Sequence, residues 1–518
     1  MRVAEPIFLS DEKITAHPVR LFQGEADDYV PVTPCRDFAK RLQRLGKDVT
    51  MTIYSNARHG FDNPLFPAVR PLPNAEVSTR CRREQRAHDV IFNLDTGKPF
   101  SSSDACVTRG ATCASRCRGS GHREKYSMNR ASLVVVTVLG LIGMPSAHAQ
   151  MDGRALRLQQ QVLGVDAHND TVQRLLYLGA DLGQRSRSGP VDLPRLREGG
   201  MHVPFFALWV PMYYKGSEAI RRTLDLRDKM QEVFDKYPDR IGLATSADDI
   251  QRLVGKGAIA AVLTIEGGHQ IADDLAVLRM YRRLGILSMT LTHFRGNNWA
   301  DSATAAPEHN GLTDFGYSVV REMNRIGMIV DVSHVSDKTF YDSIAVSTKP
   351  VIASHSSCRA LVDFPRNMSD DMLRALAING GVVGVNFASG YLNQQDAELG
   401  RQRIAARNKQ EPDLTGSALD EYARKDWVDS GYGTPGAGTA TVDDAVACID
   451  HVVKVAGIDH VGIGSDFDGI TLAPQGLEDE SKMPALTAAL MRKGYSDRDI
   501  RKIMGENFLR VVRQVVGH

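Results

Sequence analysis

The chain has 518 residues, which is enough for more than one domain. Its hydrophobic share of 42% and its charged share of 24% are ordinary for a globular protein, and a formal net charge of +1 indicates neither nucleic acid nor an acidic surface as a partner. Only two of the seven cysteines, Cys358 and Cys448, follow residue 150, which excludes a disulfide scaffold for the larger part of the chain.

The first 127 residues differ in character from the rest. Residues 1–74 are predicted to form a short α/β piece, with strands at Val19–Phe22 and Val49–Tyr54 and a helix at Pro34–Leu45. Residues 75–127 are rich in arginine, serine and cysteine, lack apolar periodicity, and space their cysteines too widely for a typical zinc site. We therefore interpret residues 75–127 as a disordered linker or as sequence that is not translated.

Two short segments in the α/β piece carry a resemblance of their own. Residues 24–31 (GEADDYVP) and 58–62 (RHGFD) resemble the C-terminal end of dienelactone hydrolase-like α/β-hydrolases. The resemblance implies that Asp27 and His59 match the acid and base of a Ser/Cys-His-Asp triad. The nucleophile comes earlier in the chain order of such enzymes, and the 18 residues before the first predicted strand contain no nucleophile motif. We interpret this piece as a truncated, inactive fragment.

Residues 128–149 have the features of a secretory signal peptide. Arg130 gives a positive n-region, Leu133–Met144 is an apolar stretch too short to span a bilayer comfortably, and Ala147–Ala149 is an A-x-A cleavage site. Since a signal peptide belongs at the start of a chain, we expect translation from Met128 and a periplasmic or secreted protein without a transmembrane anchor. The alternative is a true fusion with a buried segment or a short anchor at this place, whose location would be undetermined.

Eight apolar, β-branched runs follow, and amphipathic segments of helical period lie between them, such as Leu275–Leu284 and Phe315–Ile326. Asp314 is expected to cap the second of these helices and Gly327 to end it. Strands that alternate with helices over residues 150–518 predict a (β/α)8 TIM barrel, whose active site lies at the C-terminal ends of the strands. The predicted strands are 162–165, 203–210, 258–265, 287–292, 328–332, 350–354, 381–387 and 460–464.

Residues 391–440 interrupt this alternation. The segment is long and polar, and it is rich in glycine near Gly431–Gly438. It falls between the seventh and eighth predicted strands, so we expect a loop over the mouth of the barrel. A lid over the active site and a contact in a homodimer both remain open as its role.

Candidate metal ligands stand at the ends of six predicted strands. His168 and Asp170 follow the first strand, and residues two apart on a strand project to the same face. An imidazole and a carboxylate together suit a divalent metal such as zinc. His269, His309, His451 and His460 lack such a position and receive no role. The later strand ends offer Glu266, His293, His334, His355 and Asp466.

This pattern resembles the membrane dipeptidase (renal dipeptidase) family of metallopeptidases, from about residue 160 to the C-terminus. The resemblance implies a zinc-dependent (β/α)8 barrel that hydrolyses dipeptides, and the family includes bacterial enzymes that accept a D-residue at the C-terminal position. The motifs that carry it are 166–170 (DAHND), 266–269 (EGGH), 290–293 (TLTH), 299–302 (WADS), 333–336 (SHVS), 354–357 (SHSS), 366–367 (RN) and 464–469 (GSDFDG).

The resemblance also implies a set of metal ligands for two zinc ions per chain. His168 and Asp170 would bind one ion, and Glu266 would bridge both. His334 and His355 would bind the second ion. A water held between two zinc ions would have its pKa lowered toward neutrality and would serve as a metal-bridging hydroxide nucleophile.

The resemblance assigns three further residues to a dipeptide substrate. His293 would contact the carbonyl of the scissile bond and stabilise the negative charge that develops there. Arg366 would hold the free carboxylate with two hydrogen bonds. Asp466 would lie beside the bridging water, take its proton and deliver it to the departing amine.

The residues also allow two alternatives to a dipeptidase. Another binuclear hydrolase on the same barrel, such as a lactonase, a phosphotriesterase or an amidase, often uses a carboxylated lysine as the bridge. Here the third strand supplies Glu266 and no lysine at the matching place, which disfavours that reading. A metal-binding or ligand-binding protein without turnover is disfavoured because His293, Asp466 and Arg366 are all present.

The predicted signal peptide determines where the mature protein begins. If translation starts at Met128 and cleavage follows Ala149, N-terminal sequencing of the protein from its native source should read from Gln150. A mature N-terminus upstream of Met128 would contradict this prediction and would make residues 1–127 part of the working protein.

Overall fold

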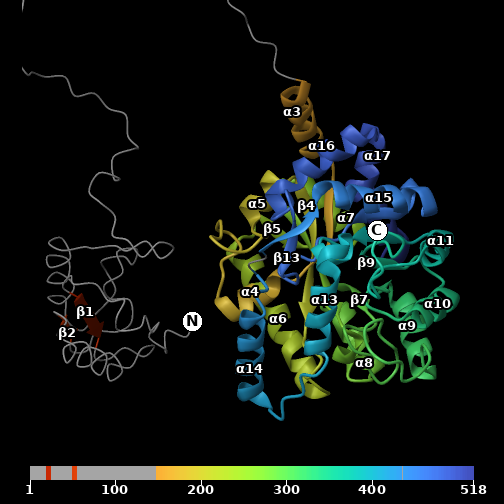
Figure 1. Cartoon of the computed structure of the whole chain (residues 1–518). Helices are drawn as coiled ribbons and strands as arrows, with labels where there is room; N and C mark the ends of the chain where they lie inside the picture. Colours follow the sequence, from red (N-terminus) through yellow and green to blue (C-terminus); the bar gives the residue numbers. More distant parts are fainter. Residues whose placement is uncertain (1–18, 25–48, 55–146, 434–435, 518) are drawn as a thin grey trace, which may run out of the picture. The chain divides into compact units, whose positions relative to one another are not determined.

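The structure of the chain is a computed structural model (Figure 1). The chain divides into two compact units, Met1–Val136 and Thr137–His518, and each is described by itself. The description covers residues 19–24, 49–54, 147–433 and 436–517.

The first unit contains two described strands. β1 (Val19–Gly24) pairs in parallel with β2 (Val49–Tyr54), in agreement with the two strands predicted there. The predicted helix Pro34–Leu45, the linker 75–127 and the apolar part of the signal-like segment lie outside the described residues.

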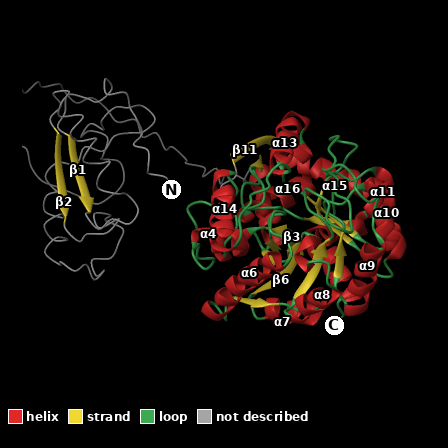
Figure 2. Ribbon diagram, turned by 90° about the horizontal axis from the view of Figure 1, so that it is seen from below, coloured by secondary structure: helices red, strands yellow, loops and turns green. Residues whose placement is uncertain are grey.

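Eight parallel strands form a nearly closed barrel in the second unit, and Figure 2 shows the helices arranged around them. A short extra strand, β5 (Ile241–Leu243), pairs with one of the eight on the outside of this path. Each of the eight overlaps a predicted strand, so the predicted (β/α)8 barrel is confirmed. In spatial order the strands are β3 (Gly164–Asn169), β4 (Met201–Trp209), β6 (Ile259–Glu266), β7 (Ile286–Thr290), β8 (Ile329–Asp331), β9 (Ile352–Ser356), β10 (Val382–Val385) and β12 (Val461–Ile463).

Several of the helices that alternate with the strands begin at a serine that caps their first turn. The hydroxyl groups of Ser246, Ser336 and Ser369 each accept a hydrogen bond from a backbone N–H in the first turn of α7, α10 and α11. No helix among the described residues is long and apolar enough to cross a membrane. The helices of the barrel are α4 (Thr171–Leu178), α5 (Leu193–Glu198), α6 (Ser217–Lys236), α7 (Ala247–Gly255), α8 (Leu275–Arg283), α9 (Asp314–Ile326), α10 (Asp337–Val346), α11 (Asp370–Asn379), α15 (Val442–Ala456), α16 (Met483–Lys493), α17 (Asp497–Arg501) and α18 (Asn507–Val515).

Helix α9 shows where local prediction succeeds and where it fails. The helix ends at Ile326, and Gly327 follows in a left-handed conformation (φ 68°), as predicted. The predicted cap Asp314 is wrong. The capping residue is Thr313, whose hydroxyl accepts from the N–H of Gly316, and Asp314 is the first helical residue. There the carboxylate of Asp314 still lies at the positive end of the helix dipole.

A carboxylate closes the seam between the first and last strands of the barrel. β3 and β12 share little backbone pairing, with one isolated bridge between Asn169 and Phe467. The carboxylate of Asp166 accepts hydrogen bonds from both the N–H (2.7 Å) and the hydroxyl (2.8 Å) of Ser465. Asp166 is fully buried, so these charge-assisted bonds replace the missing ladder and fix the two strand ends against each other.

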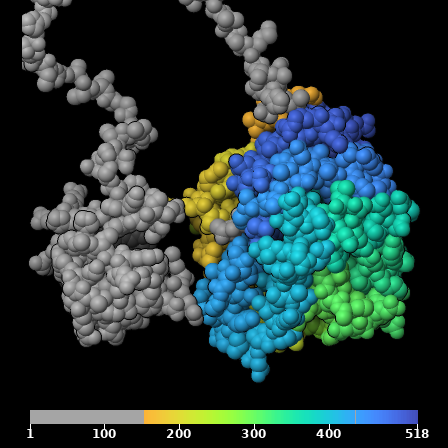
Figure 3. Space-filling view, in the orientation of Figure 1, coloured from red at the N-terminus to blue at the C-terminus, as the bar shows by residue number. Residues whose placement is uncertain are grey.

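The predicted loop at residues 391–440 is wrong, because most of this segment is helical. Three helices and a short strand occupy it, and the strand pairs in parallel with β13 (Leu472–Gln475). Polar side chains misled the prediction: helix-favouring glutamine, alanine, glutamate and arginine residues form an exposed hairpin with only a narrow apolar face. Figure 3 shows the hairpin projecting at the lower edge of the barrel unit. The elements are α12 (Ser389–Leu392), α13 (Gln394–Arg407), α14 (Gly416–Asp429) and β11 (Gly436–Thr441).

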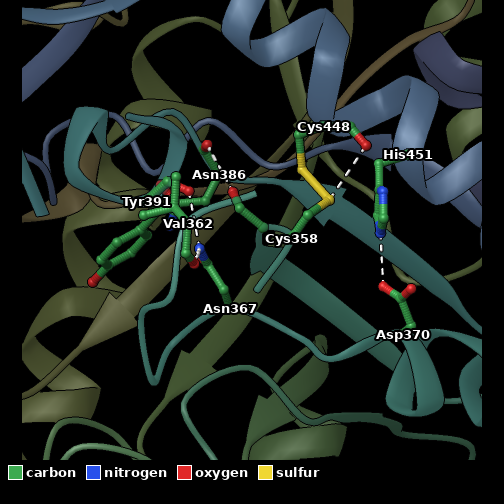
Figure 4. The surroundings of a disulfide bond; sticks show 9 residues. Cys358, Val362, Asn367, Asp370, Asn386, Tyr391, Cys448 and His451 are labelled. Atoms are coloured by element: carbon green, nitrogen blue, oxygen red, sulfur yellow. Dashed lines mark hydrogen bonds and ion pairs between the residues drawn. A yellow bond between two sulfur atoms is a disulfide. The ribbon is translucent and has the colours of Figure 1, made fainter. Parts of the chain in front are cut away.

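One disulfide bond joins the loop after β9 to α15. Cys358 lies two residues beyond the end of β9, and Cys448 lies in α15, 90 residues further along the chain (Figure 4). His451, one turn along the same helix, contacts the carboxylate of Asp370 at 2.7 Å. Helix α15 is therefore tied both to the loop after β9 and to the start of α11.

This disulfide should contribute measurably to stability. Joining residues this far apart restricts the unfolded chain, which is worth roughly 2–4 kcal/mol. Replacing Cys448 by serine should therefore lower the melting temperature by several degrees, and treatment of the wild type with a reductant should lower it by a similar amount. Thermal unfolding followed by circular dichroism measures both. A Cys448→Ser protein that melts with the oxidised wild type would contradict the prediction.

Candidate functional site

The carboxylate of Glu266 lies at the centre of a buried cluster at the C-terminal ends of the strands. Glu266 is the last residue of β6. Imidazole nitrogens from four elements surround it. The Nε2 atoms of His334, His355, His168 and His293 lie 3.0, 3.3, 3.4 and 3.7 Å from its oxygens, respectively. The structure thus brings together five side chains that are far apart in the sequence.

His168 and Asp170 reach the cluster from β3. His168 lies within the strand, and Asp170 follows its last residue at the start of α4. The Nε2 atom of His168 lies 3.6 Å from Oδ2 of Asp170. The strand therefore extends further toward the motif than predicted, and both side chains point to the same place.

His334 and His355 come from neighbouring strand ends and approach each other closely. Their Nε2 atoms are 2.8 Å apart. Burial, followed by the positive charge of Arg366, lowers the pKa of His334 well below its usual value, and burial lowers that of His355 in the same way. Neutral imidazoles have a free lone pair, which is the form that binds a metal. His334 also adopts a left-handed backbone (φ 70°), a strained conformation that the surrounding structure must hold.

The carboxylates of the cluster are destabilised as anions. Burial raises the pKa of Glu266, and burial together with the charge of Glu266 raises that of Asp170 to about 7. Burial opposes a charge on His168, but Glu266 and Asp170 outweigh it and raise its pKa well above the usual value. Negative groups held this close together in a buried site require a cation.

The donor atoms fit a divalent metal ion. Nε2 of His168 and Oδ1 of Asp170 are buried and have no hydrogen-bond partner. Three triads have donor atoms within 4.8 Å of one another, and they hold only imidazole and carboxylate groups, the donors that zinc accepts. The triads are His168, Asp170 and Glu266; Glu266, His293 and His334; and His168, His355 and Asp466.

Arg366 lies beside the cluster on the loop after β9. Its guanidinium donates to the carbonyl of His355 at 2.9 Å and contacts the hydroxyl of Ser356 at 3.3 Å. The side chain is buried, and its Nε has no partner. Within the described part of the chain, no carboxylate lies within ion-pair distance of it. A buried arginine without a counter-ion is costly, so this position suits an anionic ligand.

Asp466 completes the cluster from the end of β12. Asn386 donates to its Oδ2 at 2.9 Å and holds the side chain in place. Asp466 also has a left-handed backbone (φ 62°). Loss of hydration raises the pKa of its carboxyl to about 7 although His168 opposes this, and a carboxyl with that pKa can both accept and release a proton near neutral pH.

A pocket that opens to solvent gives access to the cluster. Its lining includes Glu266, His293, His334 and Asp466 and, opposite them, residues of α13 and α14. The segment 391–440 therefore does lie over the mouth of the barrel. Its helices form a wall of the pocket.

Several residues of the site were not predicted from the sequence. Trp209 ends β4, Tyr391 lies in α12, and both line the pocket. Asn386 follows β10 and bonds Asp466. The position of Trp209 and Asn386 at strand ends could have indicated that they belong to the site. No local feature of the sequence indicates the same for Tyr391.

Three of the histidines without an expected role have structural partners elsewhere. Nε2 of His309 lies 2.9 Å from the carbonyl of Asn297, and Nδ1 of His460 lies 2.7 Å from that of Gly381. His451 contacts Asp370, as described above. None of the three belongs to a metal-binding triad among the described residues.

Comparison with known families separates the chain into the same two parts. Residues 153–517 match the membrane dipeptidase family, peptidase family M19. Residues 2–68 match the prolyl oligopeptidase family, which agrees with the hydrolase-like fragment predicted there.

Individual relatives and solved structures resemble the barrel unit. The dipeptidase tcpJ of Claviceps purpurea (strain 20.1) is 37% identical over 366 residues, which cover 68% of this chain and 76% of that protein. The structure of the probable dipeptidase PvdM from Pseudomonas aeruginosa is 28% identical, with a TM-score of 0.60, and the match covers 71% of this chain and 98% of that one. The structure of a metallopeptidase from Rhodobacter sphaeroides, liganded with a phosphinate mimic of the dipeptide L-Ala-D-Ala, is 26% identical with a TM-score of 0.57. That match covers 68% of this chain and 99% of the other.

Metal binding should depend on the negative charge of Glu266. Glu266→Gln keeps the size of the side chain but removes the charge that the surrounding donor groups share, so the variant should hold at least one metal ion fewer per chain. Elemental analysis of the purified proteins measures this. Unchanged metal content would show that Glu266 is not a ligand.

The matched control is Glu480→Gln. Glu480 is also fully buried, and burial followed by the charge of Asp166 raises its pKa well above the usual value. Glu480 belongs to none of the metal-binding triads among the described residues, so the substitution should leave the metal content unchanged.

Proposed function

The chain belongs to the membrane dipeptidase family, peptidase family M19, and on that premise we propose that its barrel is a zinc-dependent dipeptidase with two zinc ions. The observation that carries the proposal is the convergence of four imidazoles on the buried carboxylate of Glu266, next to an arginine without a counter-ion. The imidazoles and Glu266 would supply the metal centre, and the arginine would supply a place for the carboxylate of a substrate.

The proposed ligands divide between two ions that share Glu266. His168 and Asp170 would hold one ion together with one oxygen of Glu266, and these three residues form one of the triads. His334 and His355 would hold the other ion, which the 2.8 Å approach of their Nε2 atoms supports. His293 also lies close to Glu266 but is the most distant of the four imidazoles, at 3.7 Å. We therefore assign it to the substrate.

The chemistry requires a nucleophile, a group to stabilise the oxyanion, and a proton carrier. When bound, the two zinc ions would lower the pKa of a water molecule toward neutrality and polarise the substrate carbonyl. Burial and the charge of Arg407 lower the pKa of His293, so its imidazole is neutral and donates one hydrogen bond to the developing negative charge. Asp466 accepts the proton from the water and delivers it to the amine that leaves.

Arg366 would restrict the substrate to short peptides with a free C-terminus. Its guanidinium is held by the carbonyl of His355 and the hydroxyl of Ser356, and one edge remains free of protein partners because Nε is unpaired. A carboxylate there would form a charge-assisted bidentate pair. Arg366 bonds the backbone carbonyl of His355, one of the proposed ligands, so the clamp would lie beside the metal centre.

Two finer features accompany the proposal. We propose that dipeptides with a C-terminal D-residue are among the substrates, supported by the L-Ala-D-Ala mimic bound to the metallopeptidase from Rhodobacter sphaeroides. We also propose export to the periplasm or the medium, supported by the signal-like segment 128–149. The alternative activity is that of another binuclear hydrolase on the same barrel, an amidase or a lactonase.

The substrate clamp gives the sharpest test of this function. A charge-assisted pair contributes roughly 1.5–3 kcal/mol, so Arg366→Ala should lower kcat/KM for L-Ala-D-Ala by about ten- to several-hundred-fold. The same dipeptide with a C-terminal amide lacks the negative charge. It should be a poor substrate of the wild type and should lose much less on mutation.

An arginine outside the pocket provides the control. Arg374 lies in α11, pairs with Asp371 at 2.7 Å and does not line the pocket. Arg374→Ala should leave the ratio of the two substrates unchanged. Equal losses for the free and the amidated dipeptide in Arg366→Ala, at unchanged metal content, would overturn the clamp. Failure of the zinc-loaded wild type to hydrolyse any dipeptide would overturn the function itself.

A further inference from the structure

One face of α13 forms a wall of the pocket. The residues that line it are spaced three or four apart, so they share a single side of the helix. Near the start of α13 they are Asp396 and Leu399, and near its end they are Arg403 and Ile404. Leu399 is 41% exposed, which places an apolar side chain at the open mouth of the pocket.

The inner part of this wall is apolar and continues onto the barrel. Ile404 belongs to a buried cluster with Tyr391 and Phe364, and Phe294 packs against the same cluster. Phe294, Tyr391 and Ile404 all line the pocket. A substrate side chain placed here would leave water for a hydrocarbon and aromatic surface, which favours apolar groups.

The two charged residues of this wall already have protein partners. The carboxylate of Asp396 accepts hydrogen bonds from the hydroxyl of Ser389 (2.5 Å) and the N–H of Thr439 (2.7 Å). The guanidinium of Arg403 donates to the hydroxyl of Thr471 at the rim. Both groups are therefore engaged within the protein, which leaves the apolar side chains as the free part of the wall.

The wall is held firmly against the barrel. Beyond the end of α13, the amide of Asn408 donates to the carbonyls of Phe294 (3.2 Å) and Thr304 (2.8 Å). Arg407 pairs with Asp426 of α14 at 3.1 Å, and its guanidinium lies 5.6 Å from the centre of the Trp209 ring and 4.8 Å from that of Tyr432. These contacts give α13 a fixed position, which a surface that selects side chains requires.

The position of Arg366 determines which substrate residue meets the wall. The guanidinium of Arg366 lies 5.7 Å from the centre of the Tyr391 ring. Tyr391 in turn belongs to the apolar cluster that contains Ile404. If Arg366 holds the C-terminal carboxylate, the side chain of that same residue lies next to Tyr391 and the inner face of α13.

We infer that the α13 face is the subsite for the C-terminal side chain of the substrate and that it selects bulky, uncharged, apolar residues there. The inference rests on the proposed function, because it uses Arg366 to orient the dipeptide. The preferred substrates are then dipeptides whose C-terminal residue is leucine-like or phenylalanine-like. Residues Leu399 and Ile404 determine this specificity.

A series of dipeptides tests the inference on the zinc-loaded full chain. N-terminal alanine is kept constant, and the C-terminal residue is alanine, leucine, phenylalanine, glutamate or lysine, in whichever configuration the wild type cleaves faster for Ala-Ala. Because each buried methylene adds severalfold, kcat/KM for Ala-Leu and Ala-Phe should exceed that for Ala-Ala by about tenfold or more. Ala-Glu and Ala-Lys should not exceed Ala-Ala.

A matched pair of leucines separates a subsite from a general effect on the hairpin. Leu399 lines the pocket, whereas Leu414 lies between α13 and α14, does not line it, and is equally exposed at 40%. Leu399→Ala should lower the ratio of Ala-Leu to Ala-Ala by about three- to tenfold. Leu414→Ala should leave this ratio unchanged. Ile404→Ala should lower it further, with thermal unfolding measured alongside because Ile404 is buried.

The outcomes are distinguishable from failure of the proposed function. Hydrolysis of Ala-Ala shows that the dipeptidase function stands, whatever the preference. A preference for Leu-Ala over Ala-Leu would overturn the assignment to the C-terminal residue. A preference for Ala-Glu that Arg403→Met abolishes would also overturn the inference and would assign the wall to acidic side chains. Equal effects of Leu399→Ala and Leu414→Ala would show that the wall selects nothing.

Discussion

The site depends on one electrostatic constraint, which is that the carboxyl group of Glu266 is buried and surrounded by imidazoles. Burial raises the pKa of Glu266 and lowers the pKa values of His334 and His355. Burial therefore disfavours both the carboxylate and the imidazolium forms that would be needed for an ion pair. A divalent cation resolves the conflict, because it stabilises the carboxylate and uses the lone pairs of neutral imidazoles. Metal binding is therefore expected to be coupled to the order of the strand ends themselves.

The barrel makes this arrangement possible by delivering side chains from distant parts of the chain to one edge. Glu266 ends β6, and His168 and His355 lie within β3 and β9. Asp170 and His334 follow the ends of β3 and β8. The barrel must be closed for the first and last strands to contribute together. The carboxylate of Asp166 closes it through Ser465, one residue before Asp466. Membership of the membrane dipeptidase family agrees with this arrangement.

The residues proposed to recognise the substrate lie outside the strands, in the longer loops. Arg366 stands on the loop after β9, whose base is tied to α15 by the disulfide of Cys358 and Cys448. Asn367, next to Arg366, donates to the carbonyls of Val362 (2.9 Å) and Tyr391 (3.0 Å), so it joins this loop to α12 (Figure 4). The loop that carries Arg366 is thus supported by α12 and α15, and Arg366 itself joins it to β9 through the carbonyl of His355.

The sequence by itself determined the eight strands, the barrel and the residues at the strand ends, including His168, Glu266 and His355. These features depend on apolar periodicity and on short motifs, which are local properties of the chain. Only the tertiary structure decided the pairing of Cys358 with Cys448, the proximity of Tyr391 to Arg366, and the helical hairpin that forms a wall of the pocket. The helices of this hairpin carry only a narrow apolar face. Their position is therefore decided by contacts with residues far away in the sequence, such as the contact of Asn408 with Phe294. Contacts between distant residues leave no periodic signal in the sequence, because each side chain contacts its partner only when the chain has folded.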